Sequence, residues 1–94
     1  MTVFVILRVA DPPRMKAAIA ANFPDDSIEL QSDEWLISAT GTAQEMAIRL
    51  GVNKLEGGGG ETGAAIICSI GNYWGRAATE IWEWIKTKME KSGG

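Results

Sequence analysis

The segment of residues 71–76 carries the side chains best suited to hold a partner. Tyr73, Trp74 and Arg76 combine two aromatic rings with a cation, and side chains of these types anchor many protein interfaces. The segment also joins a predicted strand to a predicted helix, and loops at such junctions often carry function. A structural alternative stays open, in which the two rings close the end of the core and Arg76 pairs with an acidic side chain near the helix start. These three residues are therefore the candidate binding residues.

Catalysis has few candidate side chains in this chain. It has no histidine and one cysteine, which excludes Ser-His and Cys-His catalysis, an internal disulfide and nearly every zinc site. Cys68 lies in the middle of a predicted strand with no base or second thiol, and we expect it to be buried and inert. The carboxylate pairs Asp25/Asp26 and Asp33/Glu34 lie in predicted turns, where acidic residues are ordinarily solvated. No cofactor and no metal ion is expected.

Gly58, Gly60 and Gly63 have the spacing of a dinucleotide-binding fingerprint. That motif needs a strand before it and a helix N-terminus after it to meet the pyrophosphate, whereas a strand is predicted to follow here. Residues 53–63 are rich in glycine and predict a flexible loop instead. At the other end of the chain, residues 92–94 are interpreted as a frayed tail rather than as a conjugation site.

The strands that position these segments follow from the apolar pattern. Residues 3–9 and 64–70 are apolar at both parities, which indicates two strands covered on both faces. Residues 27–31 and 35–40 are predicted to form a hairpin with a turn at residues 32–34.

Three helices are predicted from capping residues and from helical spacing. Asp11 precedes two prolines and is a good N-cap for a helix over residues 12–22. Thr42 and Glu45 fit a capping box at the start of a second helix. The last helix is expected over residues 77–91, with one apolar stripe formed by Ala78, Ile81, Trp82, Ile85 and Met89 and with Trp84 outside it.

The resulting order, β-α-β-β-α-β followed by a helix, predicts a single α+β domain over residues 1–94. It is the order of a ferredoxin-like split βαβ sandwich with an extra C-terminal helix, for which the strand order 4-1-3-2 is expected. In that sandwich two helices cover one face of the sheet. Because the first and fourth strands are apolar on both faces, either the last helix or a second subunit must cover the other face.

Composition indicates where such a domain would work. The chain of 94 residues is 46% hydrophobic and 22% charged, which is typical of a globular protein. No apolar run approaches the roughly 18 residues of a membrane span, and no signal-peptide pattern opens the sequence, so a cytoplasmic protein is expected. The formal net charge of -3 argues against binding to nucleic acid.

Residues 32–50 are predicted to form a hairpin, a strand and a threonine-capped helix, and residues 72–75, Asn-Tyr-Trp-Gly, form an aromatic and glycine loop after a strand. In this pattern the chain resembles small ferredoxin-like proteins related to the CRISPR-associated spacer-acquisition subunit. The resemblance implies a homodimer that packs bare sheet faces together. In some members it also implies metal-dependent phosphodiester cleavage by an acidic residue at the end of the first strand, for which Asp11 is the nearest match.

Two functions therefore stand as hypotheses. The first, which we favour, is a small non-catalytic homodimeric module for protein–protein interaction. The alternative is a metal-dependent nuclease, in which Asp11 of two subunits would hold Mg²⁺ between carboxylates. Asp11 lies beyond the predicted strand and before two prolines, so the N-cap explains it better.

Overall fold

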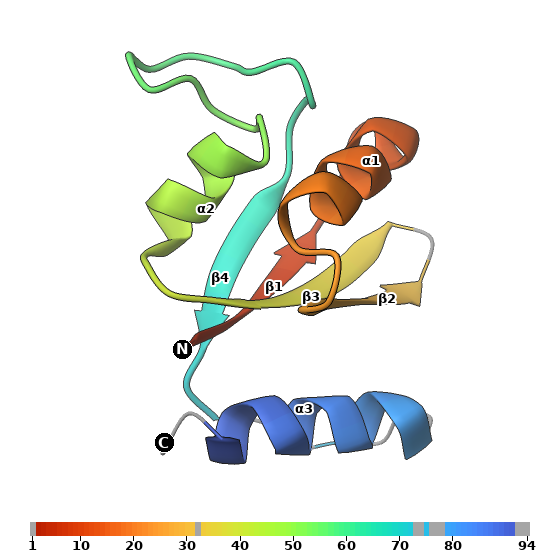
Figure 1. Ribbon diagram of the computed structural model, residues 1–94. Coiled ribbons are helices and arrows are strands. Elements are labelled where there is room, and N and C mark those ends of the chain that lie inside the picture. Colours follow the sequence, from red (N-terminus) through yellow and green to blue (C-terminus); the bar gives the residue numbers. More distant parts are fainter. Residues whose placement is uncertain (1, 32, 73–74, 76–78, 92–94) are drawn as a thin grey trace.

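The computed structural model describes residues 2–31, 33–72, 75 and 79–91. This part of the chain forms a small α+β domain with a four-stranded antiparallel sheet and three helices (Figure 1). The elements are β1 (Thr2–Leu7), α1 (Pro12–Asn22), β2 (Ser27–Gln31), β3 (Glu34–Ala39), α2 (Ala43–Arg49), β4 (Ile66–Ile70) and α3 (Thr79–Lys91).

The strands are arranged in the order β2-β3-β1-β4, so that β2 and β4 are the two edges of the sheet. Val5, in the middle of β1, pairs with Leu36 of β3 on one side and with Cys68 of β4 on the other. Directly opposed residues of an antiparallel pair point to the same face. These three side chains therefore lie on one face of the sheet.

The opposite face of the sheet packs against α1 and α2. Its side chains Phe4, Ile6 and Ile37 are completely buried, and Trp35 is 3% exposed. The helices contribute apolar side chains at helical spacing, which close this first core over the sheet. The members from the helices are Met15 and Ile19 of α1 and Met46 and Ala47 of α2.

Helix α3 covers much of the other face, where a second core forms (Figure 1). Val3 and Leu36 of the sheet and Ile85 of α3 are its buried members. Half-buried Trp82 packs against them, and so does Trp84, which the helical stripe had placed outside the core. The last helix, rather than a second subunit, thus covers β1, β3 and β2 on this side.

An ion pair joins α3 to the turn before β2. The Nζ atom of Lys88 lies 2.6 Å from Oδ1 of Asp26, in the turn before β2. Both side chains are partly shielded from water, at 20% and 39% exposed, and this strengthens the attraction relative to a fully solvated pair. The contact favours the position of α3 next to β2.

Strand β4 is less covered than its sequence predicts. Ile66 and Cys68 are exposed and Ile70 is half-buried, so the prediction of a strand covered on both faces is wrong. The prediction that Cys68 is buried is wrong for the same reason. The cause is the position of the strand, because α3 packs against β1 and β2 and β4 forms the far edge of the sheet. The apolar pattern of one strand cannot show whether that strand lies at the edge or at the centre of a sheet.

The predicted starts of α1 and α2 are confirmed, whereas the predicted start of the last helix at residue 77 lies outside the described residues. The Asp11 side chain accepts a hydrogen bond from the Arg14 amide at 3.2 Å, and α1 begins at the following proline. At α2, the Thr42 hydroxyl accepts from the Glu45 amide at 3.1 Å, while the Glu45 carboxylate accepts from the Thr42 amide at 3.3 Å. Each cap satisfies backbone donors that the first turn of a helix leaves without partners.

Strand β1 ends two residues earlier than predicted, at Leu7. Arg8 has a φ of 55°, a left-handed conformation that an extended strand cannot contain. Val9 is nevertheless buried, since the chain after the turn still passes over the first core.

The glycine-rich segment returns to the end of α2 through backbone hydrogen bonds. The Gly60 amide donates to Val52 at 2.9 Å, and the Thr62 hydroxyl donates to the Leu50 carbonyl at 2.5 Å. A Cβ atom on Gly60 would overlap the carbonyl oxygen of Gly51, so glycine is required there by close backbone approach. The predicted flexibility of residues 53–63 stays a prediction.

Candidate functional site

The candidate binding residues Tyr73, Trp74 and Arg76 lie outside the described residues. Their described neighbours Gly71 and Asn72 are exposed and follow β4 directly.

Asp11, the nearest match to a metal-binding carboxylate, has a structural role as the α1 N-cap. One carboxylate oxygen accepts from the Arg14 amide, and the other lies 3.4 Å from Nε of the same arginine. Among the described residues, no group of three or more histidine, cysteine, aspartate or glutamate side chains could hold a metal ion. The arrangement around Asp11 therefore accounts for a helix start.

The outer strand presents the most distinctive surface of the described chain. Ile66, Cys68 and Ile70 pair with Leu7, Val5 and Val3 of β1, and all six side chains point to the α3 side of the sheet. Ile66 is 52% exposed, Cys68 is exposed and Ile70 is half-buried. We call Ile66, Cys68, Ile70 and the half-buried Leu7 the β4 surface. It is an apolar part of the sheet that α3 leaves accessible.

The backbone at this edge is also accessible. Among the described strands, β4 has one neighbour, β1, so half of its N–H and C=O groups point away from this sheet. Within the described chain, no backbone or side-chain hydrogen bond from a loop or helix reaches residues 66–70 at this edge. Residues 62–75 contain no charged side chain and no proline, the usual protections of an open edge. The edge can therefore accept another strand.

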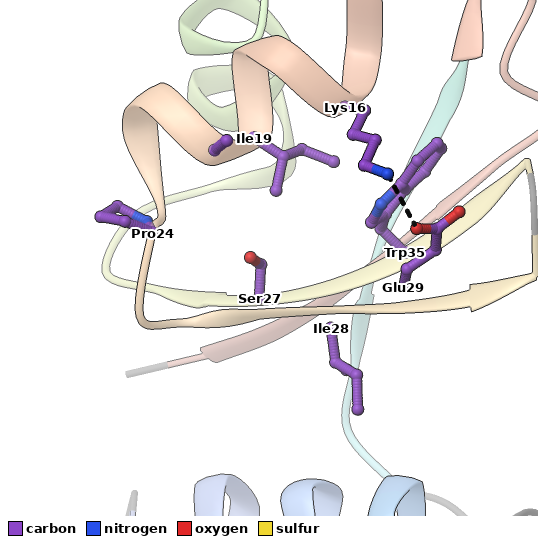
Figure 2. A pocket seen from close by; sticks show the side chains of 8 residues that line it. Lys16, Ile19, Pro24, Ser27, Ile28, Glu29 and Trp35 are labelled. Carbon is purple, nitrogen blue, oxygen red and sulfur yellow. Dashed lines mark ion pairs between the residues drawn. The ribbon is translucent and has the colours of Figure 1, made fainter. Parts of the chain in front are cut away.

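A small pocket lies between α1 and β2 (Figure 2). Its volume is about 280 Å³, slightly below the usual range of about 300–1,000 Å³ for small-molecule sites. Figure 2 shows Lys16 and Glu29, two of its lining residues, facing each other next to Trp35. The distance between Nζ and Oε1 is 4.0 Å. Both charged side chains are well exposed, which makes the pair weak. This pocket offers little room and no unpaired buried polar group to orient a ligand.

A second hollow, of about 510 Å³, is lined by Arg14, Ala17, Glu61 and Thr62. The Arg14 guanidinium donates to the Glu61 carbonyl at 2.8 Å and also lies against Asp11. The Arg14 guanidinium is therefore already bound by acceptors of the protein itself.

Membrane crossing by a helix finds no support in the part of the chain described here. None of its helices is both long enough and apolar enough to span a bilayer.

Comparison of the chain with known proteins gave no match. No protein-family model matches the chain, and no curated protein or solved structure gives a match. The resemblance to CRISPR-associated proteins therefore stays a prediction.

Sequence reasoning missed the β4 surface, although two signals pointed to it. The expected strand order places the fourth strand at an edge, and residues 62–75 carry no charge. At an edge, an uncharged strand that is apolar on both faces has a neighbouring strand on one side only. Its other side is open to a further strand, whereas a central strand is paired on both sides.

Proposed function

We propose that this chain is a small non-catalytic interaction module that works as a homodimer. Its framework is a ferredoxin-like split βαβ sandwich with an extra C-terminal helix. The element order and the antiparallel neighbours of each strand support this framework.

The β4 surface is the observation that carries this proposal. An exposed isoleucine and an exposed cysteine sit on an uncharged edge strand, and the candidate binding residues Tyr73, Trp74 and Arg76 follow this strand in the sequence. Apolar side chains grouped on an open sheet edge favour association, because the alternative is contact with water.

The side chains that chemistry would require have structural explanations. Asp11 caps α1 and contacts Arg14 through both carboxylate oxygens. Cys68 has no histidine to act as its base. These features favour binding over catalysis.

Sedimentation velocity over a wide range of protein concentration tests the homodimer. We expect the mass to rise from one chain to two, and Ile66→Lys to shift the protein to the monomer, because a charge on the β4 surface would be buried on association. Leu55→Lys is the matched control, since Leu55 is 84% exposed on the glycine-rich segment. Circular dichroism verifies that both variants fold. A single-chain mass at every concentration would refute the homodimer.

The candidate loop is tested by replacing Trp74 and Arg76 together with alanine. We expect the melting temperature to stay nearly unchanged while the dimer weakens in the same sedimentation assay. If the double variant unfolds, the loop closes the core and these residues are not a binding site.

The absence of catalysis is tested by incubating the protein with Mg²⁺ and RNA or DNA. We expect no cleavage. Cleavage by the wild type that Asp11→Asn abolishes would overturn this part of the proposal and favour the metal-dependent nuclease. Asparagine is the right replacement because it caps a helix as well as aspartate does but carries no charge.

A further inference from the structure

We infer that two copies of this chain join edge to edge, with β4 of each copy paired antiparallel to β4 of the other and Cys68 at the two-fold axis. This inference rests on the proposed homodimer and adds the surface and the register of the contact. The two four-stranded sheets would become one continuous sheet.

The choice of β4 over the opposite edge follows from the differences between the two edge strands. Strand β2 has a register irregularity between Glu29 and Gln31, and Glu29 places a charge on it. Bulges and charges are the devices that keep sheet edges from pairing. Strand β4 pairs in regular register with β1 over all of its residues and has neither device. Of the two edges, β4 is thus the one open to a further strand.

The sequence of β4 is complementary to itself about its centre. With Cys68 opposite its own copy, Ile66 faces the partner's Ile70 and Ile67 faces the partner's Ser69. Every residue of the strand is then paired, whereas an axis through Ile67 or Ser69 would leave part of the strand without a strand partner. The exposed Ile66 side chain gains an apolar neighbour on the α3 side of the sheet. A two-fold contact needs such self-complementarity, because the same patch serves both subunits.

Charge does not oppose a second copy at this edge. Each chain has a formal net charge of -3, so two copies repel each other in general. The uncharged stretch of residues 62–75 brings no like charges together at the pairing strands. A five-residue strand pair is a small contact, so we expect a dimer that depends on concentration.

The native cysteine makes the register measurable. Directly opposed residues of an antiparallel pair have Cα atoms about 4.5–5.5 Å apart, within the span of about 4.4–6.8 Å that a disulfide requires. Under mild oxidation with copper phenanthroline, at concentrations where sedimentation shows a dimer, the wild type should form a covalent dimer. The control is Ile66→Cys combined with Cys68→Ser, which carries an exposed cysteine on the same face but away from the axis. Because Ile66 belongs to the β4 surface, the two proteins are compared at concentrations where sedimentation shows the same fraction of dimer. We expect the wild type to cross-link about tenfold faster than this control.

The outcomes separate the register from the homodimer itself. Selective cross-linking at Cys68 together with a two-chain mass would support the inference. A two-chain mass with no faster cross-linking at Cys68 than at position 66 would overturn it and leave the homodimer in place on another surface. A one-chain mass at all concentrations would refute the homodimer and the inference together.

Discussion

The hydroxyl of Ser38 is an uncommon feature of the second core, and its removal should stabilise the protein. Ser38 lies in β3 opposite Val3, on the face that α3 covers, and is 2% exposed. Its Oγ atom is buried and has no hydrogen-bond partner in the described structure. Most buried polar groups in proteins have such a partner, so this hydroxyl opposes folding.

The size of the effect follows from two opposing terms. A buried hydroxyl without a partner costs about 1–3 kcal/mol, and Ser38→Ala removes this cost. The substitution also removes the packing contacts of one oxygen atom. Each contact between two non-bonded atoms contributes roughly 0.1–0.2 kcal/mol. We therefore expect Ser38→Ala to raise the free energy of unfolding by about 1 kcal/mol. Ser27→Ala is the matched control, because its hydroxyl donates to the Phe23 carbonyl at 2.8 Å, and it should lower stability by about 1 kcal/mol.

Urea unfolding followed by tryptophan fluorescence measures both changes, since the chain contains four tryptophans. The measurement belongs at low protein concentration, where association does not contribute to the apparent stability. Equal m-values would show that the variants unfold to the same extent as the wild type. A Ser38→Ala variant that is less stable than the wild type by 1 kcal/mol or more, about as much as Ser27→Ala, would refute the reasoning, because the Ser38 hydroxyl would then have a partner.

Three further predictions, two of them with a matched control substitution, test the packing and the turns by the same unfolding assay. Ile85→Ala should cost about 2–4 kcal/mol because Ile85 is buried at 9% exposed in the second core, whereas Glu83→Ala on the exposed side of α3 should cost little. Gly60→Ala should destabilise the protein, since the added Cβ would overlap a backbone carbonyl oxygen, while Gly59→Ala has open space around it and should be nearly neutral. Thr42→Ala should cost about 1 kcal/mol by removing the side-chain acceptor of the capping box at α2; a cost near zero would mean that water replaces this cap.

Local interactions explain why much of this fold is readable from the sequence. The start of α1 after Asp11 and the capping box of Thr42 and Glu45 depend on residues three positions apart, so their signals are complete within a few residues. The strand 27–31 and the alternating faces of β1 depend only on the two-residue period of a strand. Even here, the left-handed Arg8 shortened β1 relative to its apolar run, because a backbone conformation at one residue outweighs hydrophobicity.

The candidate site depended on contacts between elements that are distant in the sequence. The apolar pattern of β4 indicates two faces to bury, but it contains no information on how far α3 extends over the sheet. Only the packing of α3 against β1 and β2 leaves Ile66 and Cys68 accessible at the edge. The sequence by itself therefore determined which residues form helices and strands and which faces are apolar. Tertiary structure decided which apolar face stays open, because burial is a property of the neighbours that long-range packing brings to a residue.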